Sequence, residues 1–173
     1  MTDDRSLAAL RATSHPLRLQ MLSLLTGASM SAAEVARELG TTQANASYHL
    51  RVLADAGEIV PDGEESVRGG VAKKYRHPWE ELSTDTSRPP SDMAQHVRAM
   101  GQELARRWAG KRTKTKSVIT DAEMWVSPDT WKRVQGLLAE ASTIVHAEAL
   151  RPRSEGSLHV NVQVAAFEMR DDA

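Results

Sequence analysis

Residues 31–57 place two helix-forming segments one directly after the other, and this feature restricts the fold more than any other in the chain. The first segment begins at Ser31, which forms the pattern of a capping box with Glu34, and it stops at Gly40 after about two turns. The second segment begins after Thr41-Thr42, either of which can cap it, and runs to about Ala56, with Gly57 as its stop. A turn this short makes the two helices pack against each other.

The second helix has one apolar and one polar face. Ala46, Leu50 and Leu53 recur at the spacing that packs a helix against its neighbours. Such a helix, braced from behind by the first, can enter the major groove of DNA, which is the helix-turn-helix arrangement. The opposite face carries short polar or flat side chains and one cation: Gln43, Ala44, Ser47, Tyr48 and Arg51.

A helix is also predicted before this pair, over residues 16–27. Pro16 suits a first helical turn, and Ser14 is the predicted cap. Four residues hold its apolar face: Leu17, Met21, Leu24 and Leu25.

A hairpin is predicted after the pair. Residues 58–60 are extended in pattern, residues 61–63 (PDG) indicate a turn, and residues 67–71 resemble two strand ends around a glycine pair. The return strand carries Lys73, Lys74 and Arg76, which can follow a phosphate backbone.

Three segments carry a resemblance: SHPLRLQML (14–22), ASYHLRVLADAG (46–57) and RGG (68–70). Over about residues 5–80 the chain resembles the winged helix-turn-helix regulators of the ArsR family. The resemblance implies a DNA-binding domain over residues 1–82 that binds double-stranded operator DNA as a homodimer and usually represses transcription. It implies DNA contacts from Thr42, Gln43, Ala44, Ser47, Tyr48, Arg51, Arg68, Lys73 and Lys74.

A polar linker (83–91) leads into a predicted helix over residues 92–110. Its apolar residues form a narrow seam, which usually packs against one other helix, so we assign it to dimerisation. The seam consists of Met93, Val97, Met100, Leu104 and Trp108.

Residues 117–170 are predicted to form a small β-α-β module. Apolar and polar residues alternate over 118–126 and 158–166, as in strands, and Ser127-Pro128 begins a helix reaching about Leu150. The overall class is therefore α+β, mainly helical. Two strands and one helix bury little alone, so the module should need the rest of the chain or a second copy of itself. Whether its strands pair within or between chains stays open. Trp125, Trp131 and Phe167 are mostly core candidates, and they are also the best candidates for a pocket that binds an apolar effector.

The sequence gives little support for a metal site or for catalysis. Many ArsR members sense metals through cysteines or through Asp and His ligands on the helix after the hairpin, but this chain has no cysteine. The later helix offers only Asp92, His96 and Glu103, at a spacing that does not fit such a site. The six histidines are scattered and no catalytic motif is found, so we expect neither an enzyme nor a cofactor or metal.

Composition and charge set further expectations. No apolar run approaches the roughly 18 residues of a membrane span and the first residues are acidic, so we expect a cytoplasmic protein without a membrane partner. The net charge is only −1, but residues 81–116 hold 8 basic and 4 acidic side chains. The sequence thus predicts a homodimeric DNA-binding regulator, with two alternatives: a protein-interaction module that uses the winged helix as a scaffold, and a metal-responsive repressor.

Overall fold

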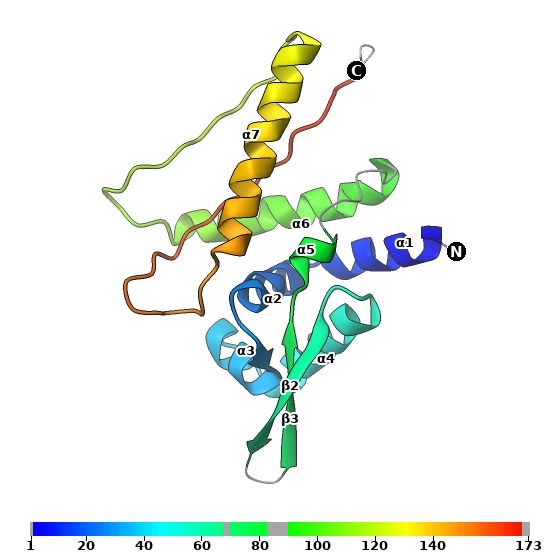
Figure 1. Ribbon diagram of the computed structural model, residues 1–173, viewed down its shortest axis with the longest axis vertical. Coiled ribbons are helices and arrows are strands. Elements are labelled where there is room, and N and C mark those ends of the chain that lie inside the picture. The colour runs from blue at the N-terminus through cyan, green and yellow to red at the C-terminus, as the bar shows by residue number, and fades with distance from the viewer. Residues whose placement is uncertain (1, 68–69, 83–89, 171–173) are drawn as a thin grey trace.

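The computed structural model describes residues 2–67, 70–82 and 90–170. The N-terminal half holds α1 (Thr2–Thr13), α2 (Pro16–Gly27), β1 (Met30–Ser31), α3 (Ala32–Leu39), α4 (Gln43–Asp55), β2 (Val60–Val67), β3 (Gly70–Arg76) and α5 (Trp79–Leu82). Two longer helices follow, α6 (Pro90–Ala109) and α7 (Pro128–Ala147). The β2–β3 hairpin projects at one end of the molecule and α7 stands at the other (Figure 1). The strands form one antiparallel sheet in the order β1-β3-β2, so the α+β, mainly helical class is confirmed.

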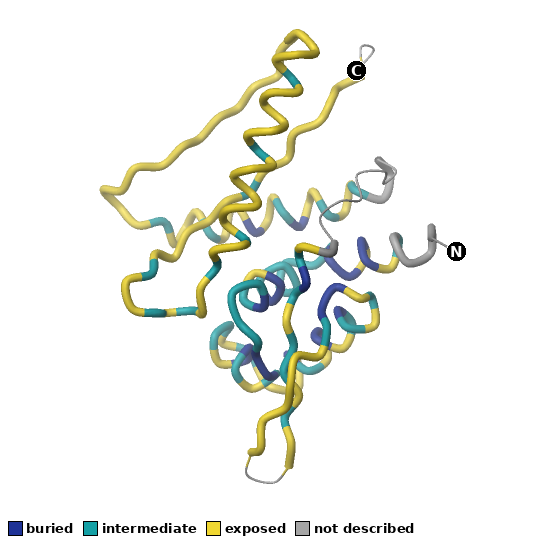
Figure 2. The backbone as a smooth tube through the Cα atoms, in the orientation of Figure 1, coloured by how far each residue is buried: buried dark blue, intermediate teal, exposed yellow. Residues whose placement is uncertain are grey.

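The hydrophobic core lies where α2, α3 and α4 meet. Ala46, Leu50 and Leu53 are buried as predicted, so one complete face of α4 packs inward. Figure 2 shows that burial is concentrated in the N-terminal half and that most of the chain after α6 is exposed. The other apolar side chains that are fully buried in this core are Met21, Leu25, Val35 and Ile59.

The capping residues decide where α2 and α3 begin. At α3 the predicted capping box is present: the backbone N–H of Ser31 donates to Glu34 Oε2 at 2.8 Å. At α2 the predicted cap, Ser14, is wrong, because Nδ1 of His15 accepts the hydrogen bond from the backbone N–H of Leu17. Ser14 Oγ donates instead to the carbonyl of Leu10 in the preceding helix, at 2.6 Å.

The predicted turn at residues 61–63 is also wrong. These residues lie inside β2, where the register against β3 shifts between Pro61 and Glu64 and Gly63 has φ +103°. A bulge inserts extra residues into one strand. Glycine is favoured there for the same reason as in a turn, because it adopts a positive φ without steric cost. The ladder between β2 and β3 continues to the pair Val67 and Gly70, and residues 68–69, which include the predicted contact Arg68, lie outside the described residues.

α6 begins at Pro90, inside the segment predicted as a linker, whose residues 83–89 lie outside the described residues. It packs against α1 and α2 with Ala99 and Glu103 buried. Glu103 is only 1% exposed, and its carboxylate accepts hydrogen bonds from Gln20, Arg106 and Arg107.

The C-terminal arm, residues 117–170, forms only part of the predicted module. α7 is confirmed and begins after the Ser127 cap, but it ends at Ala147, before the predicted Leu150. Residues 118–126 and 158–166 are not strands, which corrects the prediction. A strand needs a partner for its backbone N–H and C=O groups, and among the described residues no backbone–backbone hydrogen bond joins these two segments.

The rings of His15 and His49 lie together where α2 meets α4, with centroids 4.8 Å apart. Burial is the largest cause that lowers the pKa of each imidazole, and the positive charge of Arg18 lowers both further. The folded protein therefore resists protonation of these rings more than the unfolded chain does.

We expect the free energy of unfolding to decrease as the pH falls through about 6.5, because the unfolded chain then takes up protons that the folded chain does not. His49→Gln should make this decrease smaller, by up to about 1.4 kcal/mol per pH unit over the interval in which only the unfolded chain is protonated. The measurement is urea unfolding at several pH values between about 7.5 and 5.5. His159→Gln, at an exposed position, is the control and should leave the pH dependence unchanged. An unchanged pH dependence in His49→Gln would contradict the assignment.

Candidate nucleic-acid interface

The polar face of α4 is open to solvent. Thr42, Gln43, Ala44, Tyr48 and Arg51 are exposed and Ser47 is half-buried, so the structure places all the predicted α4 residues outside the core. Thr42 also caps the helix, since its Oγ1 accepts a hydrogen bond from the N–H of Asn45 at 3.2 Å.

A hollow of about 280 Å³ lies between the start of α3, the outer face of α4 and strand β3. Gln43, Ser47 and Arg51 line it from α4, and Lys73 lines it from β3. The structure thus brings together predicted residues from two separate motifs. Sequence reasoning missed Ala32 and Ala33, whose small side chains line the hollow from α3 directly after the capping serine.

Lys73 and Lys74 differ, although the sequence treats them alike. Lys73 is exposed and has no ion pair within the part of the chain that the structure describes. Lys74 is half-buried, and its Nζ lies 3.1 Å from Glu65 and 3.8 Å from Glu34. Pairing with two carboxylates compensates the charge of Lys74, so Lys73 is the better placed of the two to contact a phosphate.

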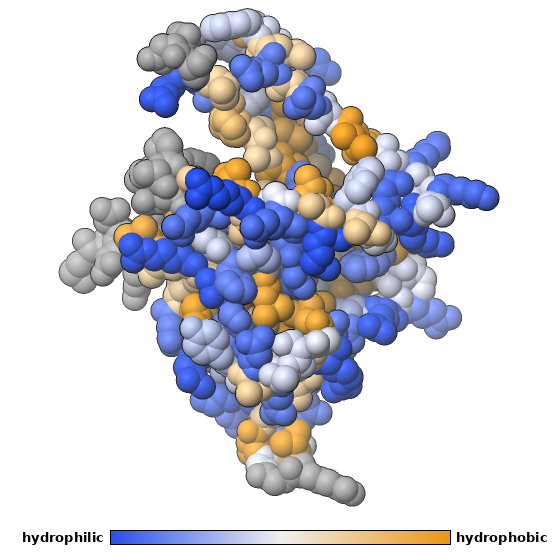
Figure 3. Space-filling model, turned by 180° about the vertical axis from the view of Figure 1, so that it is seen from behind, coloured by the Kyte–Doolittle hydropathy of each residue, from blue (hydrophilic) through white to orange (hydrophobic). Residues whose placement is uncertain are grey.

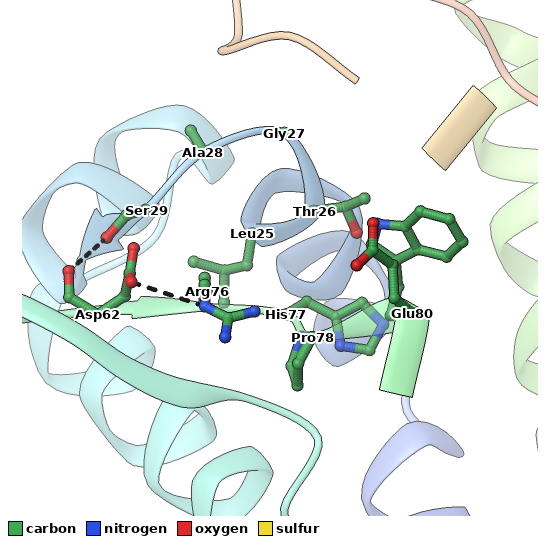
Figure 4. Close-up of a pocket in the computed structure, with 11 residues that line it drawn as sticks. Leu25, Thr26, Gly27, Ala28, Ser29, Asp62, Arg76, His77, Pro78 and Glu80 are labelled. Carbon is green, nitrogen blue, oxygen red and sulfur yellow. Dashed lines mark hydrogen bonds and ion pairs between the residues drawn. The ribbon is translucent and has the colours of Figure 1, made fainter. Parts of the chain in front are cut away.

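A second hollow, of about 250 Å³, lies at the base of the hairpin (Figure 4). Asp62 reaches across it, with its Oδ1 3.6 Å from Nε of Arg76 and its backbone carbonyl accepting a hydrogen bond from Ser29. His77 also lines the hollow, and its Nδ1 is 2.6 Å from the carbonyl of Glu58. These contacts tie the base of the hairpin to the end of α2, which fixes the direction in which the hairpin projects.

The seam predicted for dimerisation is largely uncovered on α6. Val97, Leu104 and Trp108 are exposed, and Met93 and Met100 are half-buried. α6 contacts α1 and α2, and its buried residues Ala99 and Glu103 are not part of the seam.

The three predicted effector-pocket residues are largely open to solvent. Trp125 is 87% exposed and Phe167 is 67% exposed, while Trp131 is half-buried. None of the three lines either of the hollows described above.

Two features are absent from the part of the chain that the structure describes. Residues 2–67, 70–82 and 90–170 contain no group of three or more His, Asp or Glu side chains arranged to hold a metal ion. Within the same ranges, no helix is long and apolar enough to cross a membrane.

A family model described as a helix-turn-helix domain matches residues 13–57. The chain contains a helix-turn-helix domain. These residues span α2, α3 and α4, and the β2–β3 hairpin that follows is the wing. The N-terminal half therefore has a helix-turn-helix domain followed by a β-hairpin wing, which is an architecture of DNA-binding transcription regulators.

No curated protein matches the chain. Among solved structures, the chain is similar to an ArsR-like transcriptional regulator from Rhodococcus sp. RHA1. The two share 24% sequence identity, the match covers 63% of this chain and 88% of that chain, and the TM-score is 0.38.

Proposed function

We propose that this protein is a homodimeric transcription regulator that binds double-stranded operator DNA and represses the genes beside it. One observation carries the proposal. α4 is buried on one complete face and open on the other, and the open face adjoins a hollow that also contains Lys73 of the wing. A helix held in this way can enter a major groove, about 12 Å wide, without losing its packing.

Sequence readout is assigned to the first turns of α4. The Gln43 side chain can donate to and accept from the edge of an adenine, and the Ser47 hydroxyl can serve a base edge or a phosphate. Arg51 lies two turns further along the same face, and Lys73 lies across the hollow. Both cations are assigned to phosphates, where they position the helix without reading sequence.

The dimer is assigned to the α6 seam. One winged domain reads only a half-site, so a specific operator needs a second copy related by two-fold symmetry. The uncovered side chains of Val97, Leu104 and Trp108 supply the apolar contact. Repression is proposed because it requires only that the dimer occupy the operator, whereas activation requires a further surface for the transcription machinery.

Selection from random duplex DNA at near-physiological salt should enrich an inverted repeat with half-sites about one helical turn apart. Gln43→Ala with Ser47→Ala should then lower the affinity for the selected sequence about tenfold or more, and the affinity for unrelated duplex much less. Gln95→Ala, on the exposed surface of α6, is the matched control. If nothing is enriched by the folded protein, the interaction-module alternative gains support; equal losses on both kinds of DNA would refute the readout assignment.

Lys73→Ala should weaken binding to all duplex sequences and reduce the slope of log affinity against log salt by about one, because one phosphate contact is lost. Lys74→Ala is the matched comparison and should change the slope less, since Glu34 and Glu65 already neutralise this lysine. Titration of a fluorescent duplex at several salt concentrations measures both slopes. A larger effect from Lys74→Ala would show that the ion pairs open on DNA.

Leu104→Asp should shift the protein toward monomer and weaken operator binding, because it places a charge in the seam. Gln102→Asp adds the same charge to an exposed position on another face of α6 and should leave the dimer intact. Sedimentation equilibrium gives the dissociation constant of each variant. A fully dimeric Leu104→Asp protein would move the interface away from this seam.

A further inference from the structure

We propose that the C-terminal arm is completed by a second copy of the chain: residues 118–126 of one copy pair as a β-strand with residues 158–166 of the other. The two copies would together form four strands, with both α7 helices packed on one face of the resulting sheets. The identity of the partner rests on the proposed dimeric regulator. The exchange of strands is an additional feature that the seam on α6 does not require.

The arm leaves an unusual amount of apolar side chain in water. Of the large hydrophobic residues that are exposed, all except Tyr48, Val67 and Val71 lie on α6 or beyond it. Val118 is 94% exposed, and α7 has no buried residue in its 20 residues. Figure 3 shows apolar surface between polar side chains in the upper part of the molecule, where the arm lies. Large exposed apolar patches of this kind mark interaction surfaces.

The two extended segments have the pattern of strands covered on one face. In 158–166 the even-numbered positions are apolar, and in 118–126 they are apolar apart from Thr120. The odd-numbered positions include Asp121, Glu123, Asn161 and Gln163. This pattern is typical of an antiparallel or edge strand with one face on a helix layer and the other in water. Both segments are nine residues long, so they match in length.

Residues 158–166 contact α6 of their own chain, and these contacts decide which face of the segment is free to pair with a second copy. Asn161 Oδ1 accepts a hydrogen bond from Arg107 at 3.0 Å, and Gln163 donates to the carbonyl of Met100 at 3.1 Å. The odd-numbered side chains therefore face α6. The even-numbered apolar side chains, including Val160 and Val162, are exposed.

The loop before this segment is also attached to the N-terminal domain of its own chain. Arg151 is 2.7 Å from Glu34, and Arg153 is 3.2 Å from Glu38. The carbonyl of Leu150 approaches Gly27 so closely that a β-carbon there would collide with it. These contacts hold residues 150–163 against α2, α3 and α6.

Neither segment finds a strand partner within its own chain. Among the described residues, no backbone hydrogen bond involves 118–126 or 158–166. An unpaired row of N–H and C=O groups beside apolar side chains is a template for pairing with another chain. Because the second segment is held against its own α6, a partner for the first segment must come from elsewhere.

Charge decides which strand of the second copy is the partner. If residues 118–126 paired antiparallel with their own copy about Ala122, Asp121 of each chain would face Glu123 of the other. Like charges directly opposite each other destabilise a strand pair. Residues 158–166 contain no acidic side chain and offer His159 and Asn161 on the matching face. The heterologous pair is therefore favoured.

The exposed surface is large enough for such an assembly. A stable interface of standard size uses roughly 20–30 residues from each side. Exposed large hydrophobic residues of α6 and the arm approach this number before polar neighbours are included. The arm also continues the apolar seam of α6, since Gln163 binds at Met100 within that seam.

The absence of cysteine makes cross-linking a clean test. Ala122 and Val162 are the central residues of the two segments, so they lie opposite each other whether the strands run parallel or antiparallel. We expect the double variant Ala122→Cys, Val162→Cys, treated with a short bismaleimide, to run as a covalent dimer on a denaturing gel. Each single variant should stay uncross-linked, because position 122 of one chain faces position 162 of the other.

A second pair of variants tests which face of residues 118–126 is covered in the dimer. Met124→Asp places a charge on the even-numbered face, and Ile119→Asp places one on the odd-numbered face; both residues are exposed in the single chain. Met124→Asp should raise the dimer dissociation constant about tenfold for each of its two copies in the dimer, or about a hundredfold in all. Ile119→Asp should have much less effect.

The outcomes separate this inference from the proposed function. A double variant that cross-links within one chain, or not at all, overturns strand exchange, as does a single variant that cross-links to itself. If the protein nevertheless remains dimeric and binds the selected operator, the proposed function stands and only the exchange is wrong. A protein that is monomeric and does not bind DNA overturns both.

Discussion

The structure depends first on the burial of one face of α4. Leu50 and Leu53 pack against Met21 and Val35 in the core, and burying each large apolar side chain stabilises the fold by about 1.5–3 kcal/mol. Because a helix repeats about every 3.6 residues, fixing these positions inward fixes the direction of every other side chain on α4. The exposure of Gln43 is therefore a consequence of core packing. The DNA-binding face requires no separate stabilisation.

A second constraint, the buried carboxylate of Glu103, orients α6. Burial would raise the pKa of this group, but hydrogen bonds from Arg106 and Gln20 outweigh it and lower the pKa. The Gln20 amide donates from α2 at 2.8 Å, so α6 is held with its apolar seam turned outward. Met21, the next residue on α2, packs against α4. α2 therefore contacts both α6 and α4, so in the proposed dimer a change at the α6 seam can reach the outer face of α4 through α2.

Local chemistry could be predicted from the sequence, whereas features that depend on distant partners could not. The ends of α3 and the start of α7 follow from Ser31 and Ser127, because a cap acts on backbone groups within its own turn. The glycine at position 63 suits either a turn or a bulge, and only pairing with β3 decides between them. Lys73 and Lys74 likewise look equivalent until the register places Lys74 opposite Ser31 and beside Glu34. The alternation in 118–126 predicts a strand, and the prediction is wrong for the single chain, which provides no neighbouring strand for it.

The attachment of the arm at Glu34 connects assembly to DNA recognition. This carboxylate accepts the capping hydrogen bond from Ser31, pairs with Lys74 of the wing at 3.8 Å and binds Arg151 of the arm at 2.7 Å. One side chain thus touches the start of α3, the wing and the arm. In the proposed dimer, a small shift of the Arg151 contact when the second copy pairs beside it would change the electrostatic surroundings of Glu34 and hence of Lys74. A strand exchanged far from the DNA can in this way alter the α3–β3 corner against which α4 is braced, because the three elements share one charge.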